Sequence, residues 1–96
     1  MSAYFVAQIR IHDPAAYGRY LDGFDEVFAR YRGEVVAVDE ATEVLEGEWP
    51  AARTVLIRFP NKQELLRWYR SPDYQALAAQ RRRGADCNVA AVEGRD

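Results

Sequence analysis

Gln8, Arg10 and Arg58 could together hold an anionic ligand. Apolar residues alternate with a mixed set along residues 3–11, and Gln8 and Arg10 belong to the mixed set. Residues 53–59 alternate in the same way, and Arg58 belongs to the set opposite the apolar residues Val55, Ile57 and Phe59. A guanidinium group fits a carboxylate or a phosphate with two parallel hydrogen bonds. Strand alternation predicts that these side chains lie on the sheet face away from the helices. The alternative is that both arginines form salt bridges between strands or subunits, because an unpaired buried charge is costly.

Two side chains could move protons. His12 is the single histidine of the chain, and histidine exchanges protons near neutral pH. Asp39 ends a predicted strand, and a carboxylate in a semi-enclosed cavity can act as an acid or a base. The alternatives are a surface or capping role for His12 and a turn or ion-pair role for Asp39. No second ligand stands at metal-binding spacing from His12, so we expect no metal site.

Aromatic side chains could line a pocket for a planar ligand, with core packing as the alternative. The candidates are Tyr20, Trp68 and Tyr69, together with Trp49 and Tyr74. No glycine-rich phosphate loop, serine elbow or Cys-x-x-Cys motif is present, and we expect no bound cofactor. Cys87 is expected to be a buried, inert thiol, and Arg81-Arg82-Arg83 a solvated helix end.

The elements that position these residues follow from the apolar periodicity. The pattern predicts strands over residues 3–11, 34–39, 53–59 and 88–93, a shorter extended piece over 44–46, a helix over 14–31, and two helices between residues 61 and 84. The order is β-α-β-β-α-β with the second helix split. The predicted fold class is therefore α+β, a ferredoxin-like domain with an antiparallel sheet, covering residues 1–96.

Several local signals define the helix ends. Asn61 with Glu64 three positions later forms a capping box, and Ser71-Pro72 ends one helix and begins the next. Gly84 follows the last basic residues, and we expect it to end its helix in a left-handed conformation.

The sheet face away from the helices is expected to be partly apolar. Tyr4, Val6 and Leu56 lie on this face by alternation. Val36 and Val38 are predicted to lie on it as well. An apolar patch of this kind is typical of an interaction surface. Two such sheets packed face to face predict a two-fold homodimer, a dimeric α+β barrel.

Composition excludes several classes of protein. The chain has 96 residues, a formal net charge of −2 and one cysteine. A protein that binds nucleic acids or anionic membranes in general needs a surplus of basic residues, so the net negative charge argues against both classes. No charged-then-apolar leader precedes the first strand, and no apolar run approaches the roughly 18 residues of a membrane span. We expect a cytoplasmic protein, where a single thiol stays reduced.

Three stretches resemble a bacterial family of unknown function, DUF1330, within the dimeric α+β-barrel superfamily. They are EGEWPAARTVLIRFPNKQELLRWYRSPDYQALAAQRR, DPAAYGRY near the start and VEG near the end. The resemblance implies the ferredoxin-like fold and a homodimer. Many members carry glutamate where this chain has Arg58, so an acid at that position is absent here. Related members of the superfamily include small monooxygenases and lactone isomerases, which is an analogy of fold only.

Three functions stay open. The first is a cofactor-independent enzyme acting on a small aromatic or carboxylated metabolite, with Arg10 and Arg58 orienting the anion and His12 or Asp39 moving protons. The second is a small-molecule binding or sensing protein that uses the same cavity without catalysis. The third is a dimeric accessory domain whose cavity is filled by side chains. A cavity of a few hundred Å³ separates the first two from the third.

Overall fold

The computed structural model describes residues 1–96 and contains four strands and three helices. In chain order they are β1 (Ala3–Ile11), α1 (Pro14–Phe28), β2 (Glu34–Asp39), β3 (Arg53–Phe59), α2 (Lys62–Tyr69), α3 (Pro72–Gly84) and β4 (Ala85–Glu93). The predicted bounds of β2 and β3 agree with the structure.

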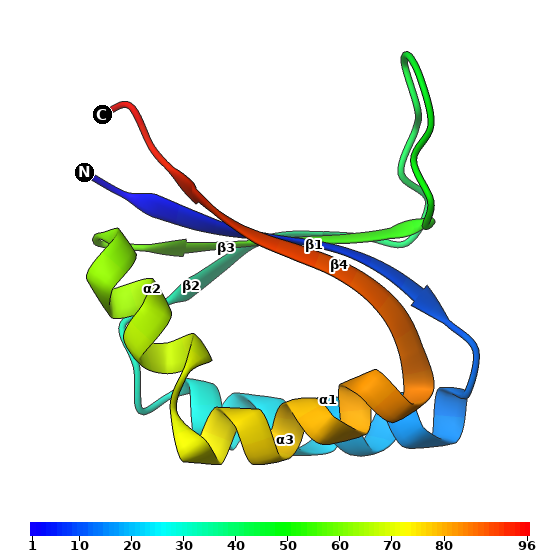
Figure 1. Ribbon diagram of the computed structural model, residues 1–96, viewed down its shortest axis with the longest axis horizontal. Coiled ribbons are helices and arrows are strands. Elements are labelled where there is room, and N and C mark those ends of the chain that lie inside the picture. Colours follow the sequence, from blue (N-terminus) through cyan, green and yellow to red (C-terminus); the bar gives the residue numbers. More distant parts are fainter.

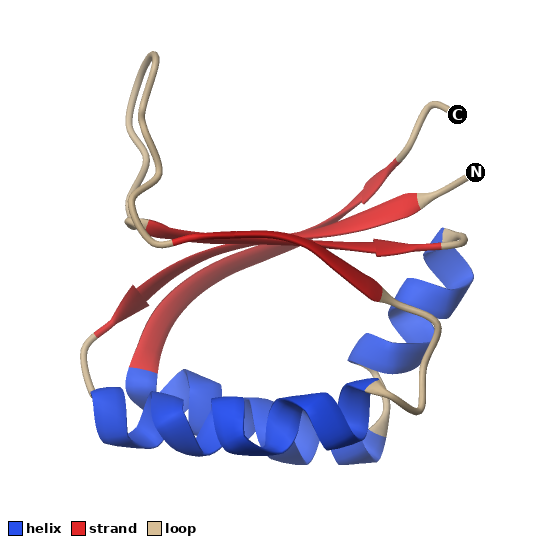
Figure 2. Cartoon of the chain, turned by 180° about the vertical axis from the view of Figure 1, so that it is seen from behind, coloured by secondary structure: helices blue, strands red, loops and turns tan.

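The four strands form one antiparallel sheet in the order β2-β3-β1-β4. This order, with helices between β1 and β2 and between β3 and β4, is the ferredoxin-like α+β fold, which confirms the predicted class. All three helices cover one face of the sheet, and α1 and α3 lie side by side beneath it (Figure 1). The other face carries no helix, and the loop between β2 and β3 projects from that side (Figures 1 and 2).

A side chain caps the beginning of each helix, and the caps of α2 and α3 are the predicted ones. The Asp13 carboxylate accepts from the amides of Ala15 and Ala16, and Asn61 Oδ1 accepts from the Glu64 amide at 2.8 Å. Ser71 Oγ accepts from the Tyr74 amide at 3.2 Å, directly after α2 ends. These side chains satisfy amides that have no partner within the helix, so each helix begins at a defined residue.

Three predicted elements differ from the structure. Strand β4 begins at Ala85 instead of Asn88, because Ala85 already pairs with Ile11 of β1. Helix α1 ends at Phe28 instead of Tyr31, because the chain turns at Ala29 and Arg30 toward Gly33. Residues 44–46 form no strand; they lie in the long loop between β2 and β3. No helix of the structure combines the length and the apolar character that a membrane crossing requires.

Gly84 has a different role from the one predicted. Its φ is not positive, and Ala85 continues directly into β4. A Cβ at Gly84 would stand 2.6 Å from the Tyr17 backbone nitrogen and 2.8 Å from the Asp13 carbonyl oxygen. The Gly84 carbonyl also accepts from the amides of His12 and Asp13 at 2.9 and 3.0 Å. Glycine is needed here because two backbone segments meet, so that the end of α3 is fastened to the start of α1.

The core lies between the sheet and the helices and is rich in aromatic rings. Trp68 and Tyr74 are fully buried, with ring centroids 4.2 Å apart. Phe5 meets the Trp68 ring edge to face at 5.0 Å, and Phe59 lies 5.3 Å from it. Trp68 therefore joins α2, α3, β1 and β3 in one packed cluster.

A β-bulge in β2 changes which side chains face the helices. Val35 lies opposite Ile57, but Ala37 lies opposite Leu56 and Val38 opposite Val55, so Val36 is the extra residue. Residues directly opposite each other point to the same face, so Val35 and Val38 both face the helices. The prediction that Val38 lies on the open face is wrong for this reason.

Candidate ligand-binding cavity

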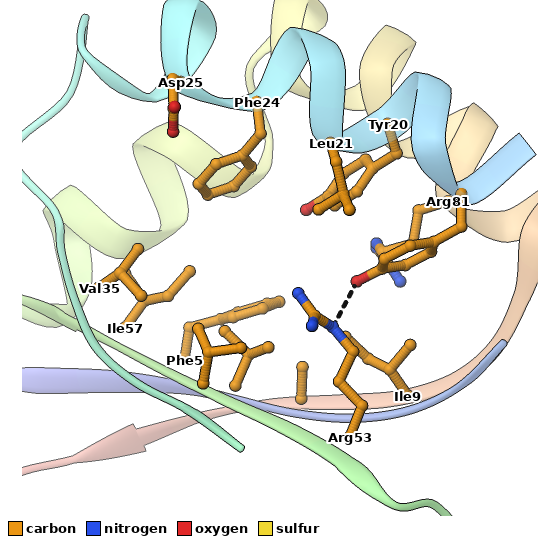
Figure 3. Close-up of a pocket in the computed structure, with 14 residues that line it drawn as sticks. Phe5, Ile9, Tyr20, Leu21, Phe24, Asp25, Val35, Arg53, Ile57 and Arg81 are labelled. Carbon is orange, nitrogen blue, oxygen red and sulfur yellow. Dashed lines mark hydrogen bonds between the residues drawn. The ribbon is translucent and has the colours of Figure 1, made fainter. Parts of the chain in front are cut away.

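A cavity of about 300 Å³ lies between α1 and the sheet. Figure 3 shows Tyr20, Leu21 and Phe24 reaching into it from α1, with Arg53 rising from β3 on the opposite side. Eleven of its fourteen lining residues are hydrophobic. The complete lining is Phe5, Ala7, Ile9, Tyr17, Tyr20, Leu21, Phe24, Asp25, Val35, Val38, Arg53, Val55, Ile57 and Arg81.

The exposed lining residues locate the mouth of the cavity. Leu21 and Asp25 on α1 are exposed, as are Val35 and Val38 on β2. The mouth therefore opens between α1 and the edge strand β2. The bulge at Val36 contributes to it, because it turns Val38 to the same side as Val35, toward the cavity.

The two arginines of the cavity lie at one end with the tyrosine hydroxyls, whereas Asp25 lies at the mouth. Arg53 Nε donates to the Tyr17 hydroxyl at 3.0 Å, and the guanidinium also pairs with Glu40. The hydroxyls of Tyr20 and Tyr74 share a hydrogen bond of 2.7 Å just behind the wall. Arg81 reaches the same end from α3, with its guanidinium 5.8 Å from the centre of the Tyr20 ring.

The tyrosine hydroxyls at this end stay protonated. Burial raises the pKa of Tyr20, and its neighbour Tyr74 raises it further. Burial also raises the pKa of Tyr74, and the nearby Arg81 charge opposes this only in part. For Tyr17, burial raises the pKa more than the Arg53 charge lowers it. The cavity therefore offers hydrogen-bond donors and cations at this end.

The polar residues predicted from strand alternation lie on the open face. Arg10 pairs with Asp86 at 2.8 Å, and Arg58 pairs with Glu34 at 3.2 Å. Gln8 accepts from the Asn88 side chain at 3.4 Å. The two arginines do not converge. Arg58 lies opposite Tyr4, and six residues along β1 separate that position from Arg10, roughly 20 Å.

His12 and Asp39 also lie outside the cavity. The His12 side chain is 48% exposed, and its Nε2 lies 3.6 Å from Asp86. Asp39 is exposed and accepts from the Ala41 amide at 2.9 Å, which stabilises the turn after β2. No three His, Cys, Asp or Glu side chains come together as a metal site.

The predicted aromatic residues are divided among different sites. Tyr20 lines the cavity, whereas Trp68 is a fully buried core residue. Tyr69 lines a separate surface hollow of about 190 Å³, with Phe5 and residues of α2 and β4. Trp49 lies in the loop between β2 and β3 and donates to Thr54 Oγ1 at 3.1 Å.

Sequence reasoning missed Arg53 and Arg81 as cavity residues. The prediction of a solvated helix end is wrong for Arg81, which is only 4% exposed. The spacing carried the signal, because Arg81 follows the buried residues Tyr74 and Ala78 at seven and three positions, on one helix face. Arg53 likewise shares strand parity with the buried residue Ile57.

Solved structures with this fold support the topology. A protein of unknown function from Rhodopseudomonas palustris superposes with a TM-score of 0.76 and 17% identity, covering 99% of this chain and 83% of that one. SnoaB, a cofactor-independent oxygenase from Streptomyces nogalater, gives 0.65 and 17%, covering 99% and 94%. A dimeric ferredoxin-like protein of unknown function from Thermobifida fusca gives 0.65 and 13%, covering 98% and 92%. Identities this low establish the shared fold alone.

The sequence comparisons assign the family. No curated protein matches the chain. The model of a domain of unknown function, DUF1330, matches residues 2–95, which is almost the entire chain. The chain therefore belongs to the DUF1330 family.

Proposed function

We propose that the protein binds a small aromatic or carboxylated metabolite in the cavity between α1 and the sheet. The observation that carries this proposal is a largely apolar cavity of about 300 Å³ with two arginines and tyrosine hydroxyls gathered at one end. Sites for small molecules combine apolar walls with a few polar groups that fix orientation, and they begin at about this volume. An accessory domain with a cavity filled by side chains is therefore the weaker reading.

Filling the cavity tests this proposal. Val55 lines the cavity, so Val55→Phe should place a ring in it. Val44→Phe is the matched control, because Val44 lies exposed in the loop between β2 and β3. We expect a metabolite library to yield compounds that raise the Tm of the wild type and of Val44→Phe, but not of Val55→Phe. A ligand at 100 times its Kd adds about 2.7 kcal/mol to the free energy of unfolding.

Two results would count against binding in this cavity. One is the absence of any thermal shift across a broad library. The other is a set of compounds that stabilise Val55→Phe as well as they stabilise the wild type.

A cofactor-independent enzyme is the second candidate, and the protonated tyrosines favour it. The Tyr17 hydroxyl, held by Arg53 at 3.0 Å, could donate a hydrogen bond to a developing oxyanion. SnoaB, a cofactor-independent oxygenase, shares the fold. The predicted proton carriers His12 and Asp39 lie outside the cavity, so this enzyme would use tyrosine donors in their place. Mass spectrometry of each bound compound after aerobic incubation separates the two functions, because a binding protein returns its ligand unchanged.

We propose further that two copies pair through their open sheet faces. Val92 is 49% exposed there, and Tyr4, Val6 and Leu56 lie on the same face across β1 and β3. The loop between β2 and β3, with Leu45 85% exposed, extends on the same side (Figure 1). A second sheet would cover this surface with an interface of roughly 1,200–2,000 Å². We place this homodimer in the cytoplasm, where Cys87 stays reduced.

A further inference from the structure

Arg81 is a buried cation without a counter-ion. Its residue is 4% exposed, and none of the ion pairs of the structure includes it. Its Nε atom is fully buried and donates to no acceptor. An arginine side chain keeps its charge in proteins, so this site holds a positive charge that nothing in the chain neutralises. A buried charge of this kind is costly unless something pairs with it.

The neighbours of Arg81 compensate for only part of this cost. The Tyr74 hydroxyl and the Cys87 thiol are polar neighbours of its guanidinium, but neither is an acidic side chain. The guanidinium lies over the Tyr20 ring, 5.8 Å from its centre, which is a cation–π contact. No acidic side chain of α1, α3, β3 or β4 faces it as a partner. Asp25 is the only carboxylate of the cavity lining, and it is exposed at the mouth.

Arg53 is the useful contrast, because the second guanidinium of the cavity is already neutralised. It pairs with the Glu40 carboxylate and also donates to the Tyr17 hydroxyl. The polar end of the cavity therefore has two guanidinium groups but an excess of one positive charge. One negative charge on a ligand would neutralise this excess positive charge, whereas a dianion would leave a net negative charge.

We infer that the ligand of this cavity is a planar monocarboxylate whose carboxylate binds Arg81 and whose apolar body lies toward Phe24 and Val35. This inference rests on the proposed function and names the class of its ligand. Figure 3 shows Arg53 and Arg81 at one end of the cavity and Phe24 and Val35 at the other. The length of the cavity along β3 follows from the strand geometry. Ile57 comes four positions after Arg53, which is roughly 13 Å along the strand. One or two fused rings with a carboxylate fit that length.

Matched pairs of compounds test the charge directly. The probes are benzoate, cinnamate and 2-naphthoate, each compared with its primary amide by calorimetry. The amide keeps the shape and removes the charge. We expect at least one acid to bind the wild-type protein at least tenfold more tightly than its amide. Phenylmalonate, a dianion, should bind more weakly than the monoanions.

Variants then assign the preference to one side chain. Arg81→Met keeps the apolar stem and removes the charge, and it should abolish the preference for the acid while the amide still binds. Arg82→Met is the control, because Arg82 is the exposed neighbour on the same helix turn. It should keep the preference unchanged.

A purely structural role for Arg81 would show itself without any ligand. If the charge exists for a ligand, unliganded Arg81→Met should have the same Tm as the wild type or a higher one. A lower Tm together with an unchanged acid preference overturns the inference. If Arg81→Met does not fold, the Nε–H resonance of Arg81 in the wild type, assigned with Arg81→Lys, should shift when the acid is added and not when the amide is added. An unmoved resonance overturns the inference as well.

The inference and the proposed function fail in different ways. Acids and amides that bind equally well, or a library that yields only neutral ligands, overturn the carboxylate while the binding cavity stands. A library without any ligand, acid or neutral, overturns the cavity and the carboxylate with it.

Discussion

The hydroxyl oxygens of Tyr20 and Tyr74 lie 2.7 Å apart in the buried wall between α1 and α3. The two rings meet nearly edge to face, with centroids 6.3 Å apart. This hydrogen bond joins the two helices that form the layer opposite the sheet, just behind the polar end of the cavity. The bond gives each of the two buried hydroxyls a hydrogen-bond partner.

A double-mutant cycle should show this pairing. Tyr20→Phe or Tyr74→Phe alone leaves one buried hydroxyl without its partner, so each should cost about 1–3 kcal/mol in the free energy of unfolding. The double variant removes both hydroxyls, and its cost should be clearly smaller than the sum of the two single costs. Urea denaturation measures all four proteins. Additive costs would show that the two hydroxyls stabilise the fold independently.

The same tyrosines should make the protein unstable in alkali. Burial raises the pKa of Tyr17, Tyr20 and Tyr74 in the folded protein, whereas an unfolded tyrosine ionises near pH 10. Their contribution is fully present below that pH and is lost as the pH rises above it, because the unfolded chain then releases protons that the folded chain keeps. Each such tyrosine adds about 1.4 kcal/mol per pH unit to the decline.

Urea midpoints measured between pH 8 and pH 11 check this dependence. The double variant Tyr20→Phe/Tyr74→Phe should lose stability less steeply above pH 10 than the wild type does. Identical slopes for the two proteins would contradict the assignment of the alkaline limb to these hydroxyls.

Two glycines of helical segments should respond to alanine in opposite directions. A Cβ at Gly84 would meet backbone atoms of Tyr17 and Asp13 at 2.6 and 2.8 Å, so Gly84→Ala should cost about 1–3 kcal/mol in the free energy of unfolding. A Cβ at Gly18, within α1, meets nothing within 4 Å. Gly18→Ala should therefore stabilise the protein by roughly 0.5–1 kcal/mol, because alanine favours helix. Thermal unfolding of both variants measures these changes in stability. A stabilising Gly84→Ala would refute the close approach of the two backbone segments.

The open sheet face should control assembly. Leu56 points to that face between Val6 and the bulged edge strand, so Leu56→Asp should place a charge in the proposed interface and produce monomers. Ala76→Asp, at an exposed position of α3, is the control and should leave the mass unchanged. Light scattering at micromolar concentration measures both. A wild type that is already monomeric would refute pairing through this face.

The sequence by itself determined the elements and their order. Alternating and helical periodicities, with capping residues such as Asp13, Asn61 and Ser71, depend on local interactions, which are readable from nearby residues. That information sufficed for the ferredoxin-like fold and for the exact bounds of β2 and β3.

The tertiary structure alone decided where the cavity lies. The bulge at Val36 reversed the parity of β2 and turned Val38 toward the helices, which no alternation pattern reveals. The register of β1 and β3 separated Arg10 from Arg58, and the packing of α3 on α1 buried Arg81 beside Tyr20. Burial and the meeting of distant side chains depend on contacts between elements far apart in the chain. For that physical reason the arginine that looked like a solvated helix end became the unpaired cation of the cavity.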